Sequence, residues 1–195
     1  LRGVDLELRA GERVALIADQ PSREVAASLA EVLAQRRAQW TGLLVEDVAA
    51  RPVVEAPREL LQALENAEVG ILCMQPMPGE LPTRMAIVRV VERRRIRYAH
   101  MVGVTAEIMQ QGMRTDYRRV DRLSDRLRER MKSASTLRVQ TEAGTEFTAS
   151  FNPALDWVKT SGLISPQYWS NLPAGEVFTT PARVDGRFVC DGTAG

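Results

Sequence analysis

The chain has one histidine, His100, and two cysteines, Cys73 and Cys190, among its 195 residues. It has no C-x-x-C pair and no H-E-x-x-H run, which excludes a cysteine-based zinc site and a zincin-type site. Thiols this sparse are typical of a reducing, cytosolic compartment, where disulfides are rare. The sequence also lacks a G-x-x-x-x-G-K-[ST] loop, so no motif supports nucleotide binding.

Neither charge nor long apolar runs dominate the chain. The formal net charge is +1, from 26 basic and 25 acidic residues, so no overall field favours a nucleic acid or a membrane surface. No apolar run reaches the ~18 residues of a membrane-spanning helix, and the start has no signal-peptide pattern. We therefore expect a cytoplasmic protein without a nucleic-acid or membrane partner. Both ends look cut, and we expect the natural chain to continue past Gly195.

Short apolar runs alternate with helical spacing along the first part of the chain. Buried strands are predicted over residues 13–18, 43–48, 69–74 and 96–102. Helices are predicted after a cap at Ser22, over residues 58–64, and from Pro82 to Arg95. This alternation predicts an α/β fold with a mostly parallel, doubly wound sheet and helices on both faces.

A change of pattern near residue 134 predicts a second domain. A long helix over residues 115–132 carries arginines and aspartates that we interpret as a solvated, ion-paired surface. Residues 136–141 and 146–151 then alternate like half-buried strands, which is typical of a hairpin. We therefore place an α/β domain over residues 1–134 and the β-rich beginning of a site-bearing domain over residues 135–195.

Two polar residues lie at or just after the carboxyl ends of predicted strands. In open α/β sheets, ligand crevices form at these ends. Asp19 follows the first strand, and we expect it to cap the next helix rather than to contact a ligand. His100 lies at the carboxyl end of the fourth strand. A hydrogen-bonded structural role is the more frequent one for such a histidine, and a role as ligand or base is the alternative.

The stretch from Asn171 to Pro181 has neither a helical nor a strand period, and it contains one carboxylate, Glu176. Pro173 restricts one backbone dihedral angle, and Gly175 permits a conformation that other residues avoid, just before the acid. A carboxylate placed in this way suits metal ligation or general-base work, and a solvated loop glutamate is the competing interpretation.

This stretch resembles the motif of the aminopeptidase T-like metallopeptidases, in which an Asn-x-Pro-x-x-Glu-Val-Phe-Thr-x-Pro run supplies the first glutamate ligand of a two-metal site. The matching positions are Asn171, Pro173, Glu176, Val177, Phe178, Thr179 and Pro181. The detailed likeness covers about the last third of the chain. It implies a metal-dependent aminopeptidase of homodimeric, cytosolic type, with a peptide substrate and two zinc or cobalt ions.

Only Glu176 can be carried over as a metal ligand, because the remaining ligands of that family lie downstream of the motif. Thr179 and Thr180 are candidates for orienting its carboxylate or a bound water. Two alternatives stay open. The 2,5-dihydroxypyridine dioxygenases share the fold and use a single iron, and a non-catalytic relative would keep the scaffold as a binding module.

Overall fold

The computed structural model describes residues 6–191 of the chain. Its contacts divide the chain into two compact units. The first unit contains the residues up to Asp121 together with Ser161–Ala174, and the second contains Arg122–Thr160 and the segment from Gly175 onward. The domain limits expected from composition, 1–134 and 135–195, stay a prediction.

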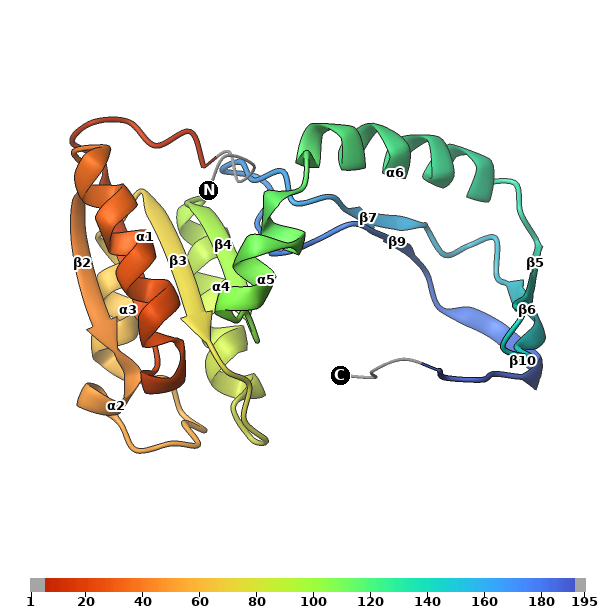
Figure 1. Cartoon of the computed structure of the whole chain (residues 1–195), viewed down its shortest axis with the longest axis horizontal. Helices are drawn as coiled ribbons and strands as arrows, with labels where there is room; N and C mark the ends of the chain where they lie inside the picture. The colour runs from red at the N-terminus through yellow and green to blue at the C-terminus, as the bar shows by residue number, and fades with distance from the viewer. Residues whose placement is uncertain (1–5, 192–195) are drawn as a thin grey trace. The chain divides into compact units, whose positions relative to one another are not determined.

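The first unit is built on a five-stranded sheet in the order β2-β1-β3-β4-β8 (Figure 1). All neighbouring strands run parallel. The strands are β1 Arg13–Ala18, β2 Gln39–Leu44, β3 Val69–Met74, β4 Arg97–Val102 and β8 Ser170–Asn171. In β3 all six residues are buried, as expected for a strand covered on both faces. The predicted α/β fold with a mostly parallel sheet is confirmed.

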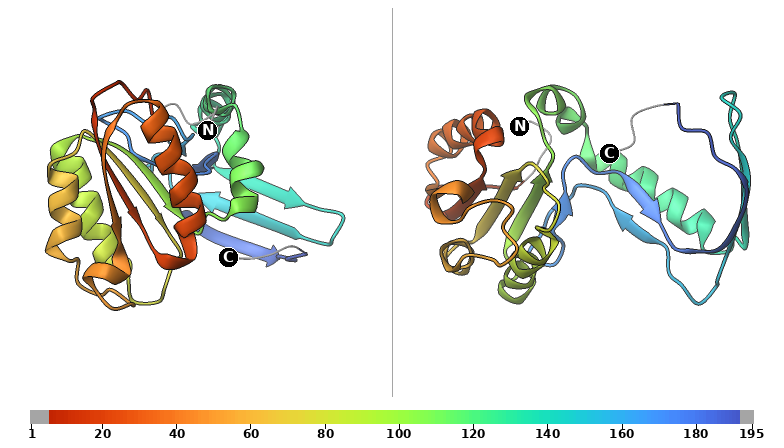
Figure 2. Two further views of the ribbon diagram at one scale, coloured as in Figure 1. Left: turned by 60° about the vertical axis from the view of Figure 1, so that its left-hand side comes forward. Right: turned by 90° about the horizontal axis from the view of Figure 1, so that it is seen from below.

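Helices cover both faces of this sheet, as Figure 2 shows. The helical segments of the unit are η1 Gln20–Ser22, α1 Arg23–Gln35, α2 Val45–Val48, α3 Arg58–Glu65, α4 Leu81–Arg94, α5 Ala106–Gln110 and η2 Gly112–Arg114. One apolar layer joins α1 to the sheet through Leu29 and Leu33, and the opposite layer joins α3 and α4 through Leu64 and Ile87. The doubly wound arrangement follows from these two layers.

The strand predicted over residues 43–48 was placed too late in the sequence. β2 ends at Leu44, and Val45–Val48 forms the short helix α2. The strand lies at the edge of the sheet, where it pairs with β1 and leaves Gln39, Trp40 and Thr41 exposed. Its first half therefore has little apolar signal, while the following apolar residues belong to the bend into α2.

The predicted cap of α1 also differs from the structure. Ser22 makes no side-chain capping hydrogen bond to α1. The side-chain cap lies one turn earlier, at the start of η1, where the Asp19 carboxylate accepts a hydrogen bond from the Ser22 backbone N–H at 3.0 Å. The capping role predicted for Asp19 is thus confirmed at η1, the single turn that precedes α1.

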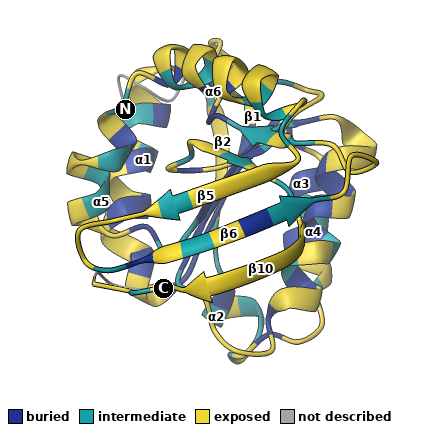
Figure 3. Ribbon diagram, turned by 90° about the vertical axis from the view of Figure 1, so that its right-hand side faces the viewer, coloured by how far each residue is buried: buried dark blue, intermediate teal, exposed yellow. Residues whose placement is uncertain are grey.

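The second unit is mainly antiparallel β-structure. Its strands are β5 Thr136–Gln140, β6 Glu146–Phe151, β7 Val158–Thr160, β9 Glu176–Phe178 and β10 Pro181–Arg187. They form a three-stranded sheet, β10-β6-β5, and a ribbon of β7 and β9. The predicted hairpin is confirmed, since β5 and β6 pair antiparallel. Figure 3 shows that most residues of β5, β6 and β10 are exposed or only partly buried.

The predicted long helix is α6, Tyr117–Met131, which runs from the end of the first unit into the second. Its charged surface carries ion pairs one turn apart, Arg128 with Asp125 at 3.4 Å and Lys132 with Glu129 at 2.7 Å. These pairs agree with a solvated, ion-paired face. No helix within residues 6–191 is long and apolar enough to cross a membrane.

A buried arginine joins the loops beyond the carboxyl ends of the central strands. The Arg51 guanidinium forms ion pairs with Asp19 and with Glu80, and both carboxylates are completely buried. It donates two parallel hydrogen bonds to Glu80, at 2.8 and 2.7 Å, and another to the Gln75 carbonyl at 2.6 Å. Burial alone would raise the pKa of Glu80, but the hydrogen bonds from Arg51 and from the Val53 N–H lower it below its ordinary value. The network therefore favours the ionised form of the buried Glu80 carboxylate.

Replacing Arg51 by leucine is expected to destabilise the protein by about 3–5 kcal/mol, because it leaves two buried carboxylates without their cation. Urea unfolding followed by circular dichroism measures the loss. The matched control is Arg89→Leu on the exposed surface of α4, for which we expect a change within about 0.5 kcal/mol. Equal effects of the two substitutions would contradict a stabilising role of the Arg51 network.

Candidate functional site

His100 lies in β4, on the face of the sheet that packs against α3 and α4, and it is 8% exposed. Its Nδ1 is 3.1 Å from the Tyr98 hydroxyl, two residues earlier on the same face. Its ring centroid lies 5.6 Å from that of Trp169, which comes just before β8. The histidine therefore belongs to an aromatic cluster at the β4 edge of the sheet.

The environment of His100 strongly favours the neutral imidazole. Burial lowers its pKa, and the positive charge of Arg84 on α4 lowers it further, to about 4. Burial likewise raises the pKa of the Tyr98 hydroxyl, so this group stays protonated and can hydrogen-bond to the ring. A neutral, hydrogen-bonded histidine can act as a positioning group, but it carries no charge near neutral pH. A role as ligand or base stays a prediction.

Glu176 is the first residue of β9 and is exposed. Gly175, immediately before it, has φ +149°, in the region that favours glycine, as expected from the sequence. β9 pairs with β7, which places Glu176 opposite Thr160. The carboxylate therefore stands at the end of a short ribbon with open access. Its role as a metal ligand stays a prediction.

The two threonines that follow have different surroundings. The Thr179 hydroxyl donates a hydrogen bond to the Asp156 carbonyl at 3.1 Å, while Thr180 is exposed. In this arrangement the Thr179 hydroxyl is engaged by the backbone. The idea that Thr179 and Thr180 orient the Glu176 carboxylate stays a prediction. His100 belongs to the first unit and Glu176 to the second.

Residues 6–191 contain no group of three or more His, Cys, Asp or Glu side chains that could hold a metal ion. This part of the chain therefore does not by itself fit either a two-ion site or a single-iron site, both of which need several such ligands.

The crevice position of the doubly wound sheet is taken by the Arg51 network. Open α/β sheets bind ligands beyond the carboxyl ends of the strands, where the order of connections reverses, here between β1 and β3. At this place the Asp19 carboxylate accepts from the Gln75 N–H at 2.7 Å and pairs with Arg51. The sequence gives no local signal for this pairing, because Arg51 lies 32 residues from Asp19 and 29 from Glu80.

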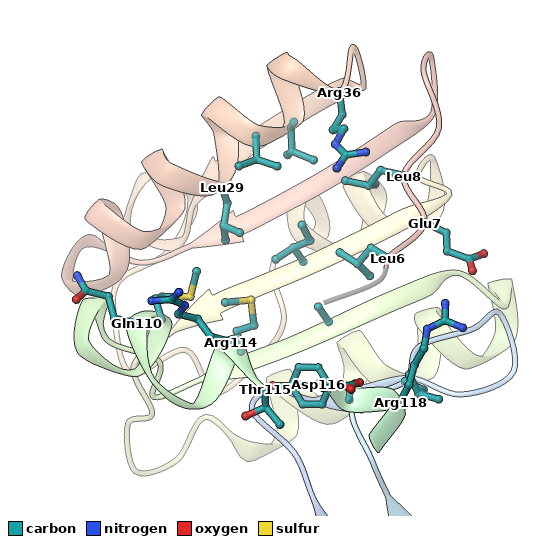
Figure 4. Close-up of a pocket in the computed structure, with 18 residues that line it drawn as sticks. Leu6, Glu7, Leu8, Leu29, Arg36, Gln110, Arg114, Thr115, Asp116 and Arg118 are labelled. Carbon is teal, nitrogen blue, oxygen red and sulfur yellow. The ribbon is translucent and has the colours of Figure 1, made fainter. Parts of the chain in front are cut away.

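Hollows are present in both units. In the first unit a cavity of about 980 Å³ opens on the α1 side of the sheet (Figure 4). In the second unit a shallower hollow of about 470 Å³ lies on one face of the β10-β6-β5 sheet and is lined by all four phenylalanines of the chain. Val177, Phe178 and Thr179 also line it, so the residues after Glu176 border an apolar, aromatic surface.

Comparison with known protein families gives a match to NicX, the 2,5-dihydroxypyridine 5,6-dioxygenases, over residues 5–193. The chain belongs to this family. The match points to the dioxygenases, which the sequence left as an alternative to the aminopeptidase T-like enzymes. Comparison with curated proteins gives no match.

The NicX-family chain also shares its fold with a solved structure, wild-type AmpT (aminopeptidase T) from Thermus thermophilus. The two superpose with a TM-score of 0.58 at 16% sequence identity. The match covers 94% of this chain and 60% of AmpT, so the chain spans less than two thirds of that protein's length. At this identity the likeness supports a structural relation and the α/β fold.

The stability of the protein is expected to fall as the pH drops from about 6.5 to about 4. In this window an unfolded chain takes up a proton on His100 while the folded protein does not, because the pKa falls from 6.5 to about 4 on folding. The loss reaches about 3 kcal/mol at most. Urea unfolding at a series of pH values measures it, and NMR of the single histidine gives the pKa directly.

The control for this prediction is His100→Gln, which removes the titrating group and should flatten the pH dependence in this window. A histidine pKa near 6.5 in the folded protein would contradict the burial of a neutral ring.

Proposed function

We propose that this protein takes part in the oxidative ring cleavage of a dihydroxylated pyridine. The observation that carries the proposal is the NicX family match, which extends over nearly the whole chain. The fold agrees with this, since the AmpT-like scaffold is the one that the sequence analysis expected for the dioxygenases. Cytoplasmic location and a homodimeric state belong to the same proposal.

The cofactor proposed for this reaction is a divalent metal ion, with a single iron as the form that the dioxygenase assignment implies. The side chains in residues 6–191 do not assemble a metal site by themselves, so we derive no reaction step from a metal held by them. Glu176 is the residue of this chain that we propose as a ligand. Its exposed position at the start of β9 leaves the carboxylate accessible to an ion.

The second candidate function is a metal-dependent aminopeptidase with two zinc or cobalt ions and a peptide substrate. The observation that favours it is the run from Asn171 to Pro181, which matches the aminopeptidase T-like motif around Glu176. A binding protein without catalysis is the third possibility, and the incomplete ligand set within the described part of the chain supports it.

The test uses protein expressed from its whole reading frame and loaded with Fe²⁺, Zn²⁺ or Co²⁺. We expect oxygen uptake with 2,5-dihydroxypyridine that depends on Fe²⁺, measured with an oxygen electrode, and no release of p-nitroaniline from leucine p-nitroanilide. Peptide hydrolysis with Zn²⁺ or Co²⁺ and no oxygen uptake would replace the dioxygenase assignment by the aminopeptidase. Absence of both activities in metal-loaded protein would leave the binding relative.

Glu176→Gln is expected to weaken metal binding by at least about tenfold, because it removes the anionic oxygen that a divalent cation prefers. Metal content by mass spectrometry and a metal titration measure the change. The folded stability should stay the same, since the side chain is exposed. Glu142→Gln, in the exposed turn between β5 and β6, is the matched control. Equal metal binding in both variants would remove Glu176 from the site.

A further inference from the structure

The first sheet has a long free edge at β2. Among residues 6–191, β2 pairs with β1 alone, at one end of the strand order (Figure 1). The strand at the other end, β8, has only two residues and so offers a short edge. β2 has six residues, and its first four, Gln39 to Gly42, are exposed. Its outward main-chain groups therefore face solvent.

The main-chain groups of β2 alternate between β1 and this free edge. The Gln39 N–H donates to the Glu12 carbonyl at 2.8 Å, which fixes the alternation. Gln39 and Thr41 direct both their N–H and their C=O groups to β1. Trp40 and Gly42 direct theirs to the opposite side. A row of outward N–H and C=O groups of this kind is a ready template for another strand.

β2 has none of the features that usually protect an edge strand. Such edges are blunted by lysine or another charge, by proline, or by a β-bulge. The sequence of β2, Gln-Trp-Thr-Gly-Leu-Leu, contains no charge and no proline, and its register with β1 runs without a break from Gln39 to Leu44. The strand also exposes a large aromatic side chain, since Trp40 is 42% exposed. An edge of this composition favours pairing with a second strand.

Trp40 and Gly42 shape the α1 side of this edge. Their register partners on β1, Val14 and Leu16, belong to the apolar layer on that side. A Cβ atom at Gly42 would lie 2.9 Å from the indole ring of Trp40, so the ring lies over the glycine. Aromatic side chains cover edge glycines in this way and help to fix strand register. A strand added at this edge would bury the half-exposed ring.

The charges at the two ends of β2 favour an antiparallel partner of the same sequence. Arg36 and Arg37 precede the strand, and Glu46 and Asp47 follow it. When two β2 strands pair antiparallel, the basic start of each strand lies near the acidic end of the other, which is attractive. Parallel pairing brings like charges together. The edge is therefore complementary to a second copy of itself, related by a two-fold axis.

We propose that two copies of this protein associate through β2, in antiparallel pairing about a two-fold axis at Thr41. Thr41 lies in the exposed half of the strand, between the two outward residues. With the axis there, Trp40 of each copy exchanges main-chain hydrogen bonds with Gly42 of the other copy. The two five-stranded sheets then form one continuous sheet. This interface specifies the homodimeric state proposed above, and it does not depend on the ring-cleavage reaction.

Disulfide trapping in the protein from its whole reading frame tests the pairing. Thr41→Cys is made in a Cys190→Ser background, because Cys190 is exposed whereas Cys73 is buried. On the two-fold axis the two introduced cysteines form a non-hydrogen-bonded pair with Cα atoms about 4.5 Å apart, within the range of a disulfide. We expect mild oxidation to give a covalent dimer on a non-reducing gel, which a reductant reverses.

Gln39→Cys in the same background is the matched control, since its side chain lies on the same face of β2 and is also exposed. In the proposed register the two copies of this residue are separated by four positions along the strands, about 13 Å, which is too far for a disulfide. We expect no more cross-linking than in the background protein without an added cysteine.

Association without a cross-link is measured by sedimentation over a range of protein concentrations. Trp40→Lys places a charge on each edge beside the pairing residues, and we expect it to weaken association by at least about tenfold. Met85→Lys on α4 is the matched control, because Met85 is 43% exposed, close to the 42% of Trp40. It should leave association unchanged. Circular dichroism checks that both variants are folded.

Three outcomes would each overturn the proposal: no covalent dimer of Thr41→Cys, equal cross-linking of Thr41→Cys and Gln39→Cys, or unchanged association of Trp40→Lys. None of these measurements depends on oxygen uptake or peptide hydrolysis. The failure of this interface is therefore distinguishable from the failure of the proposed activity.

Discussion

The ion pairs of Arg51 hold together the loops beyond the carboxyl ends of the central strands in the first unit. Asp19 follows β1, Gln75 follows β3, and Glu80 immediately precedes α4. One guanidinium contacts all three. Buried carboxylates are tolerated only when they are paired and fully hydrogen-bonded. Arg51 meets this condition for both acids, so the loop that carries it, the turn after β1 and the loop after β3 are held together.

This network also occupies the position where open α/β sheets commonly bind ligands. The connections of a doubly wound sheet leave a crevice where α1 and the later helices depart to opposite faces. In this protein the crevice is filled by protein charges that satisfy one another. The open space of the unit lies instead on the α1 face, where the chain after β4 is too short to form a full covering helix.

The NicX family match concerns the sequence, and the likeness to AmpT concerns the fold. The scaffold is shared across the fold, whereas the chemistry of a member depends on its metal ligands. Within residues 6–191 those ligands do not come together, and Glu176 stands exposed at the start of a two-stranded ribbon. The motif around Glu176 is therefore a likeness in sequence. In this part of the chain, the side chains that would complete a metal site are not assembled around it.

The sequence by itself determined the elements whose signal is local. The buried runs of β1, β3 and β4, the helices α1, α3, α4 and α6, and the β5–β6 hairpin follow from period and turn residues over a few positions. The edge strand β2 was placed too late because its outer residues are polar. Only the tertiary structure decided the partners of Arg51, the low pKa of His100, which burial and the nearby Arg84 produce, and the cavity beside α5. Each of these depends on groups far apart in sequence, and the free energy of burying a charge is set by neighbours that only folding brings together.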